Sequence, residues 1–180
     1  MNTTRESRAR LTDGISLCAR MLFYGCVFLF AALAALPWLA YRVDVLLPQL
    51  HVEISGWRTV GVVLFLCCLG MYMGCSYILS SRGRGPFVEF DPPREFVVSG
   101  PYRWSRNPIA ACLLGSLLGL AIACSSTGVF VYFLLSALLA HVQVVRLEEP
   151  LLRKRFGRSY EEYLRRVPRW MPGLSRSNRH

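Results

Sequence analysis

The stretch of sequence that decides the fold is residues 60–79, which read VGVVLFLCCLGMYMGCSYIL. No charged residue occurs in this run. About 20 residues of α-helix, at about 1.5 Å per residue, cross a hydrocarbon core of about 30 Å. The run therefore predicts a membrane-spanning helix. Its glycines Gly61, Gly70 and Gly74 predict a face of small residues on which a second helix packs closely.

Three further apolar runs occur at residues 19–38, 109–124 and 129–145. The run at 109–124 is the shortest and follows Pro108, a residue that favours the first turn of a helix. The four residues 125–128, SSTG, predict a tight turn, so we expect the last two helices to form a hairpin. The fold class that follows is an all-α membrane protein with about four transmembrane helices.

Composition supports this fold class and excludes others. Of 180 residues, 53% are hydrophobic and 18% are charged, and the formal net charge is +10. Basic residues flank the apolar runs instead of forming a stripe on a soluble domain, so anionic lipid headgroups are a better counter-charge than nucleic acid. The seven cysteines are odd in number and contain no pair spaced by two residues, which argues against a disulfide framework.

The distribution of basic residues predicts the orientation. In a four-helix topology, 19 of the 21 Lys and Arg residues lie on one side of the membrane. The positive-inside rule then places both termini and the second loop in the cytoplasm. We expect a multi-pass protein of the inner or cytoplasmic membrane, with one membrane domain at residues 19–172 and flexible basic tails at 1–18 and 173–180.

Two polar segments fall on the predicted cytoplasmic face. The loop at 81–107 is rich in glycine and proline, which permit close backbone approach to a ligand and fix the path of the chain. Within it, residues 97–100 predict a short extended piece that ends in a turn. The second segment, residues 146–172, contains basic helices that are interrupted at Gly157. We expect the two segments to form a cytoplasmic cofactor-binding cap.

Ionisable residues gather where the last apolar run ends. His141 and Glu148 share one helical face, with Glu149 adjacent. Such residues are costly near a membrane and usually face a cavity or a partner, so we interpret the glutamate pair as functional. The alternative is a solvated helix end in which the glutamates form ion pairs with Arg146 and Arg153. For His141, a packing role inside the bundle is an equally good interpretation.

Several short blocks occur in a characteristic order. They are Gly83-Arg84-Gly85, Phe90-Asp91-Pro92-Pro93, Gly100-Pro101-Tyr102-Arg103, Arg106-Asn107-Pro108, His141, Glu148-Glu149-Pro150, Arg155-Phe156-Gly157, Tyr160, Tyr163 and Val167-Pro168-Arg169. Together they closely resemble the isoprenylcysteine carboxyl methyltransferase and phospholipid methyltransferase superfamily, over residues 60–172. The resemblance implies a membrane-embedded methyltransferase that uses S-adenosyl-L-methionine, binds no metal and receives a lipophilic acceptor from the bilayer.

The resemblance also implies a set of site residues. Catalytic roles fall on Arg106, Asn107 and His141. Cofactor contacts fall on Gly83, Gly85, Pro101, Tyr102, Arg103, Arg106, Asn107, Pro108, His141, Glu148 and Glu149. Two positions depart from the usual pattern, because Asn107 stands where the family block has histidine and Ala110 where it usually has tyrosine. The asparagine also occurs in many similar bacterial chains, whereas the missing phenol at Ala110 bears on the substrate pocket.

The chemistry of S-adenosylmethionine suits these residue types. The cofactor presents an ammonium, a carboxylate, a sulfonium, ribose hydroxyls and adenine, each of which needs a complementary group. Candidate partners are Glu148 or Glu149 for the ammonium, Arg103 or Arg106 for the carboxylate, Asn107 for the ribose or adenine, and Tyr102 or Trp104 as aromatic faces.

The methyl acceptor remains open among several classes. An isoprenylcysteine-type carboxylate is already anionic, so it needs only alignment and desolvation. A phospholipid amine or a small thiol must lose a proton, for which His141 or a glutamate is the candidate base. A non-catalytic four-helix membrane protein is the alternative outside enzymes. Haem ligation by two histidines is excluded, because only one of the three histidines lies within a span.

Overall fold

The computed structural model describes residues 25–46, 55–83 and 97–170, and within them all regular structure is helical. A helix at Gly25–Leu46 contains the π-helical turn η1 and the helix α2. The elements are η1 (Ala31–Ala35), α2 (Leu36–Leu46), η3 (Ser55–Trp57), α3 (Arg58–Gly83), η4 (Gly100–Arg103), α4 (Pro108–Cys124), α5 (Thr127–Gln143), η5 (Val144–Glu148) and α6 (Glu149–Arg166). The expected tails at 1–18 and 173–180 lie outside the described residues.

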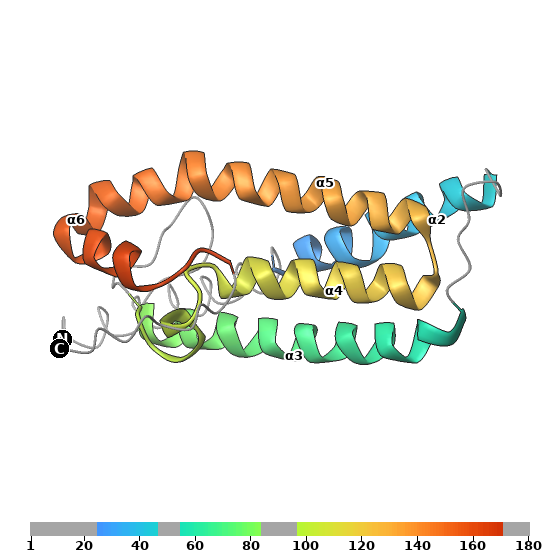
Figure 1. The fold of residues 1–180 in the computed structure, drawn as a ribbon, viewed down its shortest axis with the longest axis horizontal. Coiled ribbons are helices and arrows are strands. Elements are labelled where there is room, and N and C mark those ends of the chain that lie inside the picture. The colour runs from blue at the N-terminus through green and yellow to red at the C-terminus, as the bar shows by residue number, and fades with distance from the viewer. Residues whose placement is uncertain (1–24, 47–54, 84–96, 171–180) are drawn as a thin grey trace, which may run out of the picture.

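The helices form an elongated bundle in which α3, α4 and α5 run side by side and alternate in direction (Figure 1). Helix α4 packs against both α3 and α5, and α2 packs against α5. This alternation brings the end of α3, the start of α4 and the start of α6 to one end of the bundle. The turn between α4 and α5 lies at the opposite end, so residues distant in sequence share one polar end.

Three helices, Gly25–Leu46, Arg58–Ser81 and the one that begins at Thr127, are long and apolar enough to cross a membrane, and α4 is a shorter apolar helix. Large apolar side chains on α2, α3 and α5 point outward, and Leu139 is 69% exposed. Such a surface suits contact with lipid rather than water. The all-α membrane fold predicted from the apolar runs is therefore confirmed.

The first helix differs from its predicted bounds. It continues past residue 38 to Leu46, although Pro37 lies inside it. Proline has no N–H to donate along the helix. The π-helical turn η1 immediately precedes this position, and a wider turn is one way in which a helix accommodates such a defect. Periodicity did not reveal this extension.

Close packing between α3 and α4 depends on glycine. A Cβ atom on Gly119 would lie 2.6 Å from the backbone nitrogen of Phe65 and 2.8 Å from the carbonyl oxygen of Gly61. Backbone therefore meets backbone at this crossing, as the small-residue pattern predicts for Gly61. The prediction was wrong for Gly70 and Gly74 within the described part of the chain, where no atom of another segment lies within 4 Å of a Cβ built on either. Those two glycines face away from α4.

The predicted hairpin between the last two apolar runs is confirmed and carries an added clamp. Ser125 adopts a left-handed conformation with φ of 51°, and the side chain of Ser126 caps α5 by accepting from Val129 N at 3.0 Å. The carboxylate of Asp44 accepts hydrogen bonds from the Ser126 hydroxyl and, at 2.8 Å, from the backbone N–H of Gly128. A buried carboxylate at a helix N-terminus is favourable, so α2 is fixed to the start of α5.

Helix α5 does not stop where the fourth apolar run ends. It passes through η5 directly into α6, and Pro150 occupies the first turn of α6. Proline is tolerated in that turn. The interruption expected at Gly157 is confirmed, since this residue has φ of 50° and ψ of −126° inside α6. Figure 1 shows the chain of α6 turning back toward the bundle.

Candidate functional site

The centre of the polar end is the carboxylate of Glu149. Its Oε1 accepts from Arg106 Nη1 at 2.9 Å and from Arg169 Nε at 2.7 Å, and its Oε2 accepts from Arg169 Nη2 at 3.0 Å. Only 8% of the Glu149 side chain is exposed, against 14% for Arg106 and 30% for Arg169. Two guanidinium groups surround one carboxylate, so the cluster has one positive charge in excess.

Three segments bring these groups together. Arg106 comes from the loop before α4, Glu149 begins α6, and Arg169 follows the end of α6. The π-helical turn η5 immediately precedes Glu149, and such turns are frequent at functional sites. Because a π turn adds a residue to the helix, it changes which face the following side chains occupy. The face shared by His141 and Glu148 in a regular helix is therefore not kept.

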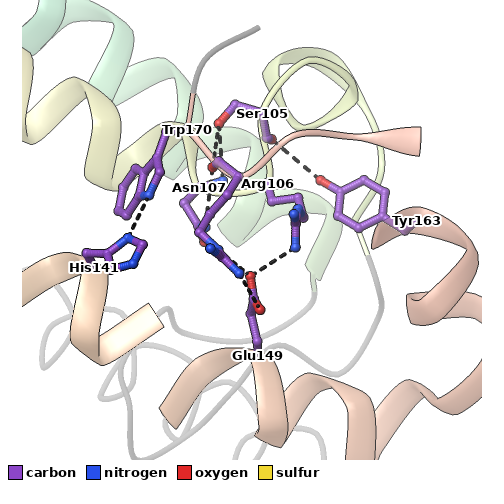
Figure 2. Close-up of polar contacts among 8 residues, drawn as sticks. Ser105, Arg106, Asn107, His141, Glu149, Tyr163 and Trp170 are labelled. Atoms are coloured by element: carbon purple, nitrogen blue, oxygen red, sulfur yellow. Dashed lines mark hydrogen bonds and ion pairs between the residues drawn. The ribbon is translucent and has the colours of Figure 1, made fainter. Parts of the chain in front are cut away.

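The segment 167–170, here called the strap, crosses back over the loop before α4. The carbonyl of Pro168 accepts from the backbone N–H of Arg106 at 2.9 Å, and the carbonyl of Arg169 accepts from the Ser105 hydroxyl at 3.2 Å. The Asn107 amide donates to the same Arg169 carbonyl at 3.5 Å. Figure 2 shows Ser105, Arg106 and Asn107 converging on this region above Glu149. The backbone of the strap thus fixes the guanidinium of Arg169 on the carboxylate.

Buried tyrosines support the strap and the loop. The hydroxyl of Tyr163 donates to the carbonyl of Tyr102 at 2.6 Å and lies 3.5 Å from the carbonyl of Ser105, the contact drawn in Figure 2. The hydroxyl of Tyr102 donates to the carbonyl of Cys75 on α3 at 3.5 Å. Tyr163 packs with Tyr160 and Val167 in one apolar cluster. Tyr102 lies in a second cluster that joins α3, η4 and α4. A chain of contacts therefore runs from α3 through η4 to α6.

His141 lies at the edge of this region and contacts the strap. Its Nδ1 accepts a hydrogen bond from the indole N–H of Trp170 at 3.2 Å (Figure 2). The two rings are tilted by 32°, with centroids 6.1 Å apart. Glu148, the last residue of η5, accepts from the Gln143 amide at 3.4 Å. His141 and Glu148 are therefore held by contacts separate from those of Glu149.

Electrostatics keep Glu149 ionised. Burial alone would raise the pKa of this carboxyl, but the hydrogen bonds and charge of Arg169, with the charge of Arg106, outweigh burial and lower it. The same ion pair raises the pKa of Arg169. Burial, together with the nearby Glu149 carboxylate, raises the pKa of Tyr160 to about 12. Tyr160 is therefore a neutral phenol near neutral pH.

The remaining residues expected at the site are placed as follows. Gly83 is the last residue of α3, and Gly85 lies outside the described residues. Pro101 and Arg103 are in η4, where the side chain of Arg103 is exposed. Pro108 starts α4, followed by half-buried Ala110. Tyr102 was expected to offer an aromatic face to the cofactor, but its ring is buried in the core.

The role of Arg169 in the site was not predicted. Arg169 was recognised only as part of a sequence block, and its partnership with Glu149 depends on the break in α6 at Gly157 and on the end of α6 at Arg166. The alternative pairing of the glutamates with Arg146 and Arg153 is not what the structure shows for Glu149, whose ion pairs are with Arg106 and Arg169. The sequence feature that pointed to Arg169 was the block at 167–169, which lies directly after the end of α6.

Comparison with known proteins supplies the family. The family described as "Phospholipid methyltransferase" matches residues 57–159, which is more than half of the chain. The chain belongs to this family. Membership fits the apolar helices and points to a membrane methyltransferase. The matched region includes Arg106, Asn107, His141 and Glu149 but ends before the strap, so Arg169 lies outside it.

Two curated relatives of this phospholipid methyltransferase family member have names that refer to metal resistance. One is the "Cobalt-zinc-cadmium resistance protein CzcN" of Cupriavidus metallidurans, 33% identical over 67% of this chain and 56% of the relative. The other is the "Nickel-cobalt-cadmium resistance protein NccN" of Alcaligenes xylosoxydans xylosoxydans, 28% identical over 74% of this chain and 62% of the relative. The matched region thus spans less than two thirds of either relative's length. No solved structure matches the chain.

Proposed function

We propose that this protein transfers a methyl group from S-adenosyl-L-methionine to a lipophilic acceptor at the polar end of the helix bundle. Family membership supports the reaction class. The main structural support for the site is one cluster. Arg106 and Arg169, which come from two different segments, both contact the nearly buried carboxylate of Glu149, which comes from a third. In this proposal the cap formed by the loop before α4 and the segment from α6 onward faces the cytoplasm.

The donor set fits the cofactor's polar end. Among the described residues, the buried Nε–H of Arg106 has no hydrogen-bond partner, and a ligand carboxylate would accept it. Half-buried Glu148, next to the paired Glu149, provides the negative charge that an α-ammonium needs. The excess positive charge of the arginine cluster favours an anionic group nearby. These features correspond to the amino-acid end of S-adenosylmethionine.

Each residue then has a role in binding or orientation. Bound S-adenosylmethionine supplies an electrophilic methyl group, and its transfer by in-line displacement requires alignment and exclusion of water. Arg106 holds the carboxylate end of the ligand, and Asn107 contributes an amide for the ribose or adenine. Glu149 orients both guanidinium groups. The exposed indole of Trp104 offers an aromatic face that buried Tyr102 does not.

The site's protonation favours an isoprenylcysteine-type carboxylate as acceptor. An amine or a thiol needs a base, but Glu149 is held ionised by two guanidinium groups, which makes it a weak base. Nδ1 of His141 already accepts from Trp170. A carboxylate acceptor needs no base, and the excess positive charge attracts it. A phospholipid amine, a small thiol and a non-catalytic role are the competing outcomes.

Calorimetry tests the cofactor, with detergent-purified protein and S-adenosylmethionine or S-adenosylhomocysteine as ligand. We expect saturable binding that is lost in Arg106→Ala and Glu149→Gln. The matched control is Glu162→Gln, because Glu162 also pairs with an arginine but its side chain is 53% exposed, away from the cluster. The proposal would be contradicted if the folded wild type bound no ligand at about millimolar concentration. A dissociation constant in that range corresponds to a binding free energy of about −4 kcal/mol.

Labelled methyl donor then identifies the acceptor. The protein in vesicles is offered a prenylcysteine, a phosphatidylethanolamine and a small thiol in separate reactions. The proposal expects transfer to the prenylcysteine, with a base-labile product typical of an ester. Transfer only to the amine or thiol would leave the cofactor assignment intact and overturn the carboxylate preference.

A second candidate function is a contribution to resistance against divalent transition metals. Both curated relatives carry such resistance in their names. In this second proposal the contribution comes through a methylated product. Growth of a deletion strain in cadmium, cobalt or zinc, complemented with wild type or Glu149→Gln, tests this. Equal rescue by the wild type and by Glu149→Gln would show that resistance does not depend on the proposed site.

A further inference from the structure

We propose that the outer face of α6 is a binding surface for anionic phospholipid headgroups, distinct from the proposed methyl-transfer site. Six basic side chains on α6 are exposed, against two acidic ones. The basic residues are Arg153, Lys154, Arg155, Arg158, Arg165 and Arg166, and the acidic ones are Glu161 and Glu162. The apolar face of α6 is turned inward and packs on the protein, as the buried pair Tyr160 and Tyr163 shows. The cationic side chains of α6 are therefore the ones that lie at the surface of the described structure.

The position of these basic residues along the helix indicates that lipid headgroups are their binding partner. About 20 residues of helix cross the hydrocarbon core. Counting from Thr127, the crossing ends near Arg146. Outward-facing apolar residues continue to that level and slightly beyond, since Leu147 is 60% exposed and Leu151 is 45% exposed. The basic residues begin two positions after Leu151. Arg153, Lys154 and Arg155, which precede the turn at Gly157, are thus at the depth at which lipid headgroups lie.

Charge and chemistry complete the argument. Arginine and lysine near a membrane surface are each attracted to anionic lipid by about 1 kcal/mol. Within the face, Arg158 forms an ion pair with Glu162, and these side chains are 93% and 53% exposed, so the pair contributes little. A lipid phosphate therefore meets little competition from the acidic residues. At the opposite end of the bundle the described residues include two arginines, Arg42 and Arg58, and no comparable cluster.

Spin-labelled lipids measure this selectivity without requiring any methyl transfer. The full chain is reconstituted in phosphatidylcholine vesicles, and the motionally restricted fraction is compared for spin-labelled phosphatidylglycerol and phosphatidylcholine. We expect about threefold or greater preference for phosphatidylglycerol. The preference should fall when NaCl rises from about 0.1 M to about 1 M, because the Debye length shortens from roughly 10 Å to roughly 3 Å.

Variants assign the preference to α6. Replacing Lys154, Arg155 and Arg158 together by glutamine should abolish most of it, whereas the matched control Arg42→Gln with Arg58→Gln should preserve it. Equal association of both lipids with the wild type overturns the proposal, as does a preference that survives high salt. If the lipid preference is lost in the control variant but kept in the α6 variant, the preference arises at the opposite end of the bundle, and the proposal is overturned. The salt series on wild type decides the matter if a variant does not fold.

Discussion

Arg169 binds Glu149 through two parallel hydrogen bonds of 2.7 and 3.0 Å, across 20 positions of sequence. This bidentate geometry requires a planar guanidinium and fixes both side chains in orientation. The pair joins the chain after α6 to the start of α6, and Arg106 extends the contact to the loop before α4. The strap, α6 and that loop are therefore one polar unit.

Removing one side of this pair is expected to destabilise the polar end. Arg169→Gln should lower the free energy of unfolding by about 1.5–3 kcal/mol, the range for hydrogen bonds to charged groups. Arg169→Lys should recover only part of the loss, because lysine cannot reproduce the fork. Denaturation in mixed micelles measures the change. A comparison with Arg158→Gln, expected to cost about 0.5 kcal/mol or less, separates the cluster from surface ion pairs.

Acid should weaken the same unit. The folded-state pKa of Glu149 lies below its ordinary value of 4.5, so the ionised carboxylate stabilises the fold above pH 4.5. This contribution is lost as pH falls from 4.5 through the lower folded-state pKa. The difference in melting temperature between wild type and Glu149→Gln should therefore stay constant near neutral pH and shrink in acid. A difference that grows in acid would reverse the sign of the assigned shift.

Glycine at the crossing of α3 and α4 should be irreplaceable. Gly119→Ala would place a Cβ atom 2.6 Å from the backbone nitrogen of Phe65, and neither backbone can yield easily. We expect a loss of about 1–3 kcal/mol, as for other overpacked contacts. Gly70→Ala is the matched control, because no atom lies within 4 Å of its Cβ and alanine favours helix. Equal melting temperatures for the two variants would refute the close approach.

The contact between His141 and Trp170 should appear as an energetic coupling. His141→Ala and Trp170→Phe each remove one side of the 3.2 Å hydrogen bond. In a double-mutant cycle the coupling should be about 0.5–1.5 kcal/mol, the usual net value of one hydrogen bond. Unfolding in mixed micelles supplies the four free energies. Strict additivity would mean that the strap does not depend on His141.

Much of the fold was predictable from local chemistry. The apolar run at 60–79 predicted α3, the SSTG turn predicted the hairpin of α4 and α5, and Gly157 predicted the turn within α6. Residues 97–100 also behave as expected, since Ser99 is extended and Gly100 has φ of 61°. Each of these features depends on residues close together in the chain, for which periodicity and backbone preference are sufficient.

The candidate site was predictable only in part. The glutamate pair drew attention because charge near a membrane is costly. The Arg106-Asn107 block was singled out only by the family resemblance. The sequence could not separate Glu149 from Glu148, since adjacent helical residues differ by about 100° in direction. It also could not reveal η5, which changes that direction again. The structure distinguishes them by partner, with Glu149 on two arginines and Glu148 on Gln143.

The sequence by itself determined that this protein is an all-α membrane protein, where its apolar helices lie, and that polar chemistry gathers at its loop and C-terminal blocks. Hydrophobic length and turn residues are local properties, so one chain suffices to read them. Only the tertiary structure decided that Arg169 reaches Glu149, that Asp44 caps α5, and that Gly119 rather than Gly70 carries the helix crossing. Those contacts depend on how helices are directed and rotated against each other, and that geometry is fixed only when the whole bundle packs.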